Sequence, residues 1–400
     1  MINKELLELL FEAASIQRWN DHIRPEHFSE LDKQAHKMVY AFVLAKIEEA
    51  DHETELNWQR LIEGGLFEFL HRIVLTDIKP PVYYKLMAEK GEQLNKWVIE
   101  NLEEKVPGLR SSKVDLLSMM EKYFMLSNRA NLEKRILQAA HYLATNWEFK
   151  IIYRLNEGLY GLEETKAAIA NQIEEHYDLA GVQKLSLGKK TSNFLDLVGQ
   201  LRFQQRWAQS PRVPRTSVMG HMLIVAMMSY LCSVELEACP KRIYNNYFAA
   251  LFHDLPEVLT RDIVSPVKRS VAGIEKIIKA IEHRQLEERI FPLLPVEWHD
   301  ELKYFTEDEF TGKIIDDNLV RHVSSEEISS QYNLDRFSPM DGEMIKACDQ
   351  LAAYIETFLS ISHGIKSYHL EEGNRQLFDL YKDQVVAGIN FGRLFRCFKI

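Results

Sequence analysis

The chain has 400 residues, of which 46% are hydrophobic, and a formal net charge of −10 at pH 7. This length exceeds the size at which one hydrophobic core usually keeps growing, so we expect two domains. The negative charge argues against a general nucleic-acid-binding protein. The 4 cysteines form no CxxC pair, the first residues lack a signal-peptide pattern, and no apolar run reaches the ~20 residues of a membrane span, so we expect a reduced, cytoplasmic protein.

Almost every segment shows the apolar spacing of a helix. In the first half, predicted helices start near Leu6, run from Pro25 to about Glu49, and resume after the Pro80–Pro81 break to about Glu104; others cover about 112–125, 129–156 and 162–178. A polar stretch with a glycine, 185–190, is the predicted boundary. In the second half, helices are predicted at about 190–207, 217–235, 243–258, 270–290, 307–320 and 341–361. The sequence therefore predicts an all-α protein with domains at 1–185 and 186–400.

The most informative stretch, 248–262, contains the adjacent residues His253 and Asp254, followed by Glu257. Apolar residues recur here at spacings of three and four, which predicts a helix with one buried face. On a single helix, Glu257 would share a sector with the two residues before it. An imidazole and two carboxylates beside an apolar face are costly unless they are paired or bind a metal.

Two further residues of ligand type lie in apolar helical runs. His221 lies within 218–228, and Asp349 lies at the edge of the buried face of 344–355. Together with His253 and Asp254 they offer two imidazoles and two carboxylates. This mixed donor set suits Mn, Fe, Co, Ni or Zn, with room for a bound water.

A basic island precedes the first of these histidines. No acid occurs between Asp196 and His221, and the island consists of Arg202, Arg206, Arg212 and Arg215. A phosphate-bearing substrate would favour such a segment, and a solvated loop is the alternative.

The order of the four ligand-type residues resembles the H…HD…D signature of HD-domain metal-dependent phosphohydrolases. Within that superfamily the chain is most similar to the bacterial 5′-deoxynucleotidases of the YfbR type, through the run 253–268 and the pair Arg206–Trp207. The resemblance covers roughly 195–365. It departs at Gly220, where the family usually has an acid, and in a longer stretch between Lys268 and Asp349.

The resemblance implies a role for each of these residues. One divalent metal would be held by His221, His253, Asp254 and Asp349. Glu257 would be the general acid or base, and Asp262 would assist it or hold the sugar. Arg206 and Lys268 would bind the phosphate, and Trp207 would line the sugar site. The alternatives are a surface carboxylate for Glu257, a turn residue for Asp262, simple packing for Trp207 and a solvated lysine for Lys268.

The activity implied is hydrolysis of nucleoside 5′-monophosphates, with deoxynucleotides preferred. Two alternatives stay open: a larger substrate, such as a nucleoside triphosphate or signalling nucleotide, and a non-catalytic nucleotide sensor or scaffold. We expect a small-molecule nucleotide as the partner, with neither nucleic acid nor membrane, and a homodimer stays open.

The first half weakly repeats the second. The matching pairs are 17–19 with 205–207, His36 with His221, 75–82 with 259–267, and 140–144 with 348–352. His71–Arg72 stands where the second half has His253–Asp254, and His141 replaces the last aspartate. We therefore expect 1–185 to be a degenerate HD-like domain without a metal, in which Arg18, Trp19 and Asp77 leave a residual nucleotide pocket.

Overall fold

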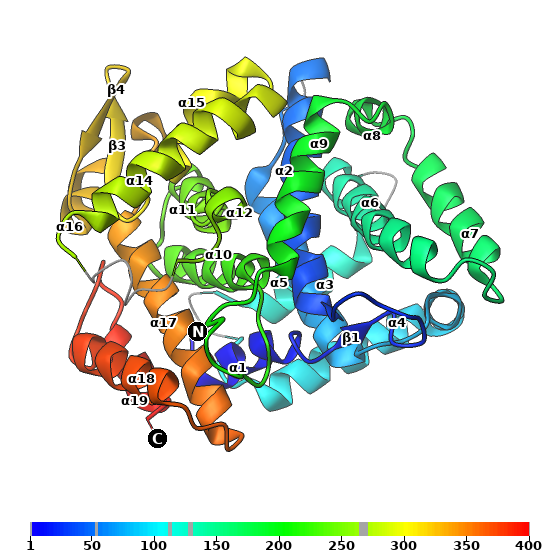
Figure 1. Ribbon diagram of the computed structural model, residues 1–400, viewed down its shortest axis with the longest axis horizontal. Coiled ribbons are helices and arrows are strands. Elements are labelled where there is room, and N and C mark those ends of the chain that lie inside the picture. Colours follow the sequence, from blue (N-terminus) through cyan, green and yellow to red (C-terminus); the bar gives the residue numbers. More distant parts are fainter. Residues whose placement is uncertain (1, 53–54, 111–113, 127–130, 264–270, 400) are drawn as a thin grey trace. The chain divides into compact units, whose positions relative to one another are not determined.

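The computed structural model describes residues 2–52, 55–110, 114–126, 131–263 and 271–399 (Figure 1). These residues form helices almost throughout, with two small two-stranded antiparallel sheets. The predicted all-α fold class is confirmed. Contacts divide the chain into two compact units, Asn3–Ser192 and Asn193–Ile400. The boundary predicted from sequence, between 185 and 186, lies a few residues before this division.

The N-terminal unit is centred on α2, which packs against α6, and α6 also contacts α3. Its elements are α1 (Lys4–Glu12), β1 (Gln17–Arg18), β2 (Phe28–Ser29), α2 (Glu30–His52), α3 (Trp58–Leu75), α4 (Pro80–Lys105), α5 (Leu116–Met125), α6 (Leu132–Leu155), α7 (Leu162–Glu174) and α8 (Ala180–Ser186). The helix predicted to start at Pro25 begins only at Glu30, because the two residues before it pair with β1.

The C-terminal unit is centred on α10, which packs against α11 and α17. Its longer elements are α9 (Lys190–Gly199, which begins before the division), α10 (Val218–Glu235), α11 (Pro240–Phe252), α12 (Glu257–Thr260), α14 (Ile274–Gln285), α15 (His299–Thr306), β3 (Lys313–Asp316), β4 (Leu319–His322), α16 (Ser325–Glu327), α17 (Gly342–Ser362), α18 (Tyr368–Tyr381) and α19 (Phe391–Cys397). Short 3-10 and π turns lie at Gln200–Phe203, Leu286–Ile290, Phe291–Leu293, Val296–Trp298, Ile328–Tyr332 and Asp335–Phe337.

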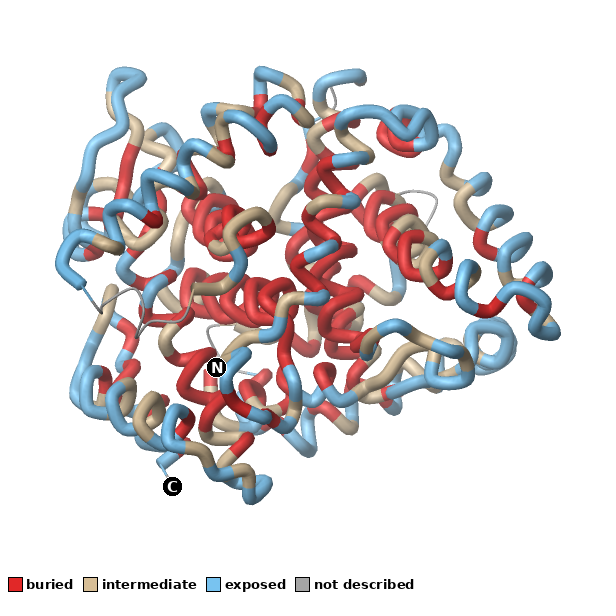
Figure 2. Tube along the Cα trace, viewed as in Figure 1, coloured by how far each residue is buried: buried red, intermediate tan, exposed pale blue. Residues whose placement is uncertain are grey.

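Helix α10 is apolar on every side. The Ser217 side chain caps its first turn by accepting a hydrogen bond from the Gly220 amide at 2.9 Å. Its residues are buried from Val218 to Ser233 (Figure 2). By length and composition it is the one helix among the described residues that could cross a membrane, but 89% of it is buried inside the protein. A helix that is apolar all round and buried in this way is a core helix, and a polar side chain on it needs a partner.

The helix predicted at 243–258 is interrupted, which corrects the expectation that His253, Asp254 and Glu257 share one helical sector. Helix α11 ends at Phe252, and α12 begins at Glu257. Pro256 explains the break, because its ring lacks an N–H donor and would collide with the carbonyl of Phe252, four residues earlier. Asp254 therefore lies in a turn between the two helices.

The helix predicted at 307–320 is also wrong, because residues 313–322 form the β3–β4 hairpin. Its turn residues Asp317 and Asn318 have φ values of 50° and 62°. Positive φ at both central residues is typical of a tight hairpin turn, and aspartate and asparagine tolerate it well. Beyond the hairpin, Lys313 also pairs with Met340, just before α17 begins.

Gly342 at the start of α17 permits this close approach of chain segments. A Cβ atom at 342 would overlap the backbone of Phe310 and Thr311. We predict that Gly342→Ala lowers the free energy of unfolding by at least about 2 kcal/mol, because backbone atoms cannot yield as a side chain can. Chemical unfolding followed by circular dichroism measures this effect.

The matched control is Gly91→Ala in α4, where the nearest atom to a new Cβ is Met87 Cε at 3.5 Å, an ordinary contact. We expect a change within about 1 kcal/mol there. Equal effects of the two substitutions would contradict the overlap argument.

Candidate metal centre

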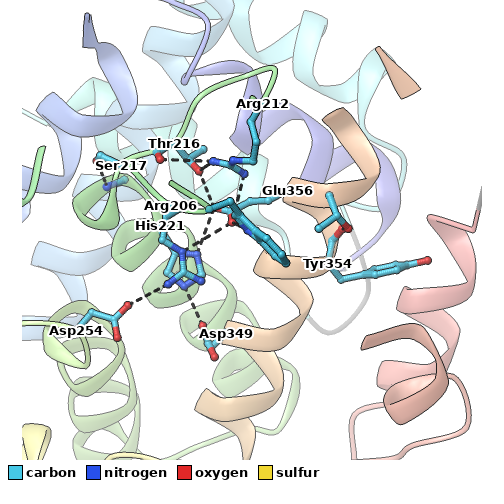
Figure 3. Close-up of polar contacts among 12 residues, drawn as sticks. Arg206, Arg212, Thr216, Ser217, His221, Asp254, Asp349, Tyr354 and Glu356 are labelled. Atoms are coloured by element: carbon cyan, nitrogen blue, oxygen red, sulfur yellow. Dashed lines mark hydrogen bonds and ion pairs between the residues drawn. The ribbon is translucent and has the colours of Figure 1, made fainter. Parts of the chain in front are cut away.

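His221 lies in the first turn of α10 and is fully buried. Its Nε2 lies 2.8 Å from Asp349 Oδ1, and its Nδ1 lies 3.4 Å from Glu356 Oε1. In Figure 3, Asp254 and Asp349 lie on one side of the His221 ring, and Glu356 lies on the other with Arg212 and Thr216. The imidazole is thus held between carboxylates from α17.

His253 follows α11, and its ring orientation is fixed by the backbone. The Nδ1–H donates to the carbonyl of Ala250 at 2.7 Å, because a carbonyl can only accept. Therefore Nε2 carries the lone pair of the neutral ring, which is the form that binds a metal. It lies 3.2 Å from Asp254 Oδ2 and 3.9 Å from Asp349 Oδ1.

These side chains fit a metal ion. One ligand atom from each of His221, His253 and Asp349 lies within 4.8 Å of the others, and all three residues are buried. His253 Nε2 and Asp254 Oδ2 are buried atoms without a hydrogen-bond partner in the described part of the chain. Metal-ligand atoms that converge from three chain segments, two of them without a hydrogen-bond partner, are what a divalent cation would satisfy. The group could therefore hold a metal, with Asp254 at its edge.

The electrostatics of the group favour positive charge. Burial would raise the pKa values of Asp254 and Asp349, but the neighbouring histidines and Arg206 outweigh it and lower both. Burial also opposes the charged form of His253, yet Asp254 and Asp349 raise its pKa to about 9. The carboxylates thus stay ionised and stabilise a cation placed between the rings.

Glu356 belongs to this network and was missed in the sequence. It is fully buried, and it accepts hydrogen bonds from Thr216 Oγ1 at 2.7 Å and from Trp207 Nε1 at 2.9 Å. Arg212 Nη1 lies 3.4 Å from its Oε2. A carboxylate behind the Nδ1 of a metal-binding histidine orients the ring and sets its tautomer. The available signal was its position, seven residues after Asp349 within one apolar helix.

Arg206 lies between the two groups of carboxylates. Its Nη1 is 3.6 Å from Asp254 Oδ2, and its Nε is 3.8 Å from Glu356 Oε2. Burial disfavours its charge, but Glu356, Asp262, Asp254 and Asp349 outweigh this and raise its pKa. The buried Nε has no hydrogen-bond acceptor within the described ranges, and the Glu356 carboxylate is its nearest ion-pair partner there.

Trp207 has a backbone φ of 56°, a strained value for a bulky residue. Its indole donates to Glu356, and its ring packs so closely on α18 that a Cβ at Gly373 would lie 2.6 Å from Cη2. These contacts explain why the strained backbone persists. The ring position is thereby fixed, while its predicted role at a sugar stays a prediction.

A pocket of about 310 Å³ lies beside Arg206. It is lined by Gln205, Arg206, Ala208, Gln209, Ser210, Pro211, Arg212, Arg215 and Thr216. Three arginines of the predicted basic island therefore line it, whereas Arg202 is buried and does not. A pocket lined by guanidinium groups suits a phosphate.

The remaining predicted site residues differ in their placement. Glu257 is buried, and its amide donates to the Asp254 carbonyl at 3.0 Å, so it follows the ligand turn directly. Asp262 is half-buried and acts electrostatically on Arg206. Lys268, together with Pro266, lies outside the described residues.

A second group of ligand-type residues is exposed or half-buried and already paired. His283 Nδ1 lies 3.2 Å from Glu307 Oε1, and Lys303 Nζ lies 2.7 Å from Glu287 Oε1. The lysine supplies the positive charge there, so this group does not call for a cation.

The helical fold and the buried His, His, Asp group beside arginines fit a phosphohydrolase that could hold a metal. Residues 198–378 match the HD domain family. The chain is similar to a 5′-deoxynucleotidase of Vibrio parahaemolyticus serotype O3:K6 (strain RIMD 2210633), at 26% identity over 45% of this chain and 81% of that protein. It is also similar to a 5′-deoxynucleotidase of Klebsiella pneumoniae (strain 342), at 28% identity over 46% and 79%, and to 5′-deoxynucleotidase YfbR of Salmonella typhi, at 25% identity over 45% and 79%. The HD domain match and these relatives support a phosphohydrolase enzyme.

We predict that Glu356→Gln lowers the free energy of unfolding by about 3 kcal/mol, because it leaves two buried arginines without their shared carboxylate. Urea unfolding measures the change. Glu343→Gln, at an exposed position of the same helix, is the control and should change it by less than about 0.5 kcal/mol. If Glu356→Gln unfolds at the wild-type urea concentration, the carboxylate does not hold this network together.

Proposed function

We propose that the C-terminal unit releases phosphate from nucleoside 5′-monophosphates, with deoxynucleotides preferred, and that one divalent transition metal (Mn, Co, Fe, Ni or Zn) is required. The observation that carries this proposal is the convergence of His221, His253 and Asp349 at one buried point, with Asp254 at its edge. The 5′-deoxynucleotidase names of the similar proteins support the substrate class.

The metal, when bound, would acidify a water molecule and polarise a phosphoryl oxygen. In the proposal His221, His253, Asp254 and Asp349 hold it, and Glu356 keeps the His221 ring in position through its Nδ1. Two neutral imidazoles and two carboxylates would balance the charge of a divalent ion. This balance lowers the free-energy cost of burying the ion.

In the proposal, the arginines of the pocket bind the substrate. The guanidinium of Arg206 would contact the phosphate, and Arg212 and Arg215 would add to the positive field around it. Trp207 would line the sugar from the strand-like segment that carries Arg206. Lys268 is proposed as a further phosphate contact from its sequence position alone.

Proton transfer falls to Glu257, with Asp262 beside it. Glu257 is buried and directly follows the turn that carries Asp254, so its carboxylate would accept a proton from the attacking water and deliver one to the leaving oxygen. Asp262 acts on Arg206, and it would hold that side chain charged and in place.

A phosphate-release screen tests the proposed activity. The full chain is stripped of metal with EDTA and refilled with Mn, Co, Ni, Mg or Zn in turn. It is then supplied with deoxynucleoside and ribonucleoside 5′-monophosphates and with triphosphates. We expect no release without metal and fastest release from deoxynucleoside monophosphates. Turnover of triphosphates alone would favour the larger-nucleotide alternative, and saturable binding without any turnover would favour a sensor.

Two substitutions separate metal binding from proton transfer. Asp254→Ala should abolish both metal content, measured by elemental analysis, and activity. Glu257→Gln should retain the metal and lower kcat by about 10²–10⁴-fold, because only the proton transfer is removed. Full metal content in the Asp254 variant, or full activity in the Glu257 variant, would remove the corresponding assignment.

A further inference from the structure

The N-terminal unit contains its own buried cluster of cations on α2, α3 and the β1 segment. Lys33 and Lys37 of α2 are fully buried, and the side chains of Arg18 and Arg72 are 11% and 16% exposed. Buried cations are costly unless they are matched by acceptors or anions. Each cation of the cluster should therefore have an acceptor or a carboxylate nearby.

Three carboxylates form ion pairs with most of these cations. Arg18 donates through Nη1 to Glu30 Oε2 at 2.8 Å and through Nε to Glu148 Oε2 at 2.9 Å. Arg72 Nε lies 3.7 Å from the same Glu30 oxygen. The third carboxylate, that of Glu68, pairs with the Lys37 amine.

Lys33 has a different partner, since its amine contacts the ring of His141, with Nε2 at 3.4 Å. Burial lowers the pKa of His141 far below its ordinary value, and Lys33, Lys37, Arg18 and Arg72 lower it further. The imidazole is therefore neutral. The charges of Lys33, Lys37, Arg18 and Arg72 all act on the His141 ring, and burial lowers the pKa of the Lys33 amine well below its ordinary value although Glu30 and Glu148 oppose this.

The backbone around this cluster repeats that of the metal centre. Gln17 pairs with Ser29 in an antiparallel bridge, as Gln205 pairs with Ser217. Each serine immediately precedes the helix that lies at the centre of its unit. Lys33 comes four residues after Ser29, as His221 comes four residues after Ser217. The sequence-based match of His36 with His221 is therefore wrong, and Lys33 takes that place.

The side-chain contacts follow the same correspondence. Lys33 contacts His141, as His221 contacts Asp349. Seven residues after His141 and seven after Asp349 comes a buried glutamate that accepts a hydrogen bond from a tryptophan Nε1. The distance is 2.8 Å from Trp19 to Glu148 and 2.9 Å from Trp207 to Glu356. The two tryptophans also share a positive φ, of 54° and 56°. These matches support a tandem duplication.

Three positions that match proposed metal ligands have changed their charge. Lys33 replaces a histidine, His141 replaces an aspartate, and Arg72 replaces the aspartate of the His-Asp pair. The replacements remove the acidic ligands and place fixed positive charges near the point where a metal would lie. Positive charge that would attract a phosphate is retained, whereas the Lewis acid that would activate water is lost.

We propose that the N-terminal unit holds a metal-independent anion site, with Lys33 and Arg72 in place of the cation, that binds the phosphate of a nucleoside monophosphate without hydrolysing it. The nucleotide part rests on the function proposed above, because it assumes that the retained Arg18 and Trp19 serve the same ligand as Arg206 and Trp207. An anion at this point would stabilise the charged form of Lys33 against the cost of its burial.

The first test measures binding in EDTA by calorimetry, using the full chain with deoxyadenosine 5′-monophosphate or inorganic phosphate as probe. We expect a saturable site that is at least about ten-fold weaker in Lys33→Met and unchanged both in Asp254→Ala and in Arg215→Met, which removes an arginine of the C-terminal pocket. Lys46→Met, on the same helix outside the cluster, is the control and should bind as the wild type does. Tighter binding of the nucleotide than of phosphate would mean that the sugar and base are also recognised.

Three results would overturn the proposal: no saturable binding by the wild-type chain in EDTA, equal binding by folded Lys33→Met, or binding that is lost in Asp254→Ala. The last result would place the anion in the C-terminal unit. Failure of the phosphate-release screen would leave this measurement unaffected, so the two proposals can fail separately.

The second test restores the acidic ligands with Lys33→His, Arg72→Asp and His141→Asp in one chain. We expect the metal content to rise from one to two ions per chain and the EDTA-resistant binding to disappear. Circular dichroism establishes that the variant is folded. A folded variant that still holds one ion, or a wild-type chain that already holds two, would contradict the placement of Lys33 at the cation's position.

Discussion

Carboxylates inside an apolar helical bundle must be matched by positive charge, and this constraint shapes the centre of the C-terminal unit. Asp349 and Glu356 lie on one helix, seven residues apart, and both are buried. Arg206 and Arg212 form ion pairs with Glu356. Asp349 contacts the His221 imidazole at 2.8 Å and accepts from the side-chain amide of Gln350 at 2.7 Å, and in the proposed function its charge would serve a metal ion. In the proposed function, Glu356 is therefore part of the scaffold, whereas Asp349 takes part in the chemistry.

The same constraint gives a common account of the N-terminal unit. There the arginine, tryptophan and glutamate arrangement persists, while the ligand positions have become cationic or neutral. A protein that loses a divalent ion from a buried site must replace its charge or remove the acids around it. In the duplication proposed above, this unit would do both, through Lys33 and His141. Its core can therefore remain intact without a metal.

The sequence predicted a good part of this organisation. His221, His253 and Asp349 could be chosen because a polar ligand-type residue in an apolar helical run is costly without a partner, and the structure brings these three together. Glu356 met the same criterion but did not belong to the resemblance that drew attention to the others. Its partners, Trp207 and Thr216, are distant in sequence, so their convergence could not be read from spacing.

Other errors have local causes. Apolar periodicity continued across Pro256 and concealed the end of α11, although the ring of a proline inside a predicted helix was a clear warning. The pair Asp317–Asn318 signalled a hairpin within a segment whose apolar residues were read as helical. In the repeat, aligning histidine with histidine favoured His36 over Lys33, because a lysine in the place of a ligand could be identified only from the strand pairing beside it.

The packing of Trp207 on Gly373 carries a consequence for the helices that follow the site. Helix α18 holds none of the proposed ligands, yet the indole lies where any side chain larger than hydrogen at 373 would have to go. A substitution there would displace the ring from Glu356 and thereby disturb the arginine that adjoins it. The C-terminal helices thus help to set the shape of the proposed phosphate pocket, and a residue in this apparently peripheral region is tied by packing to the site on other helices.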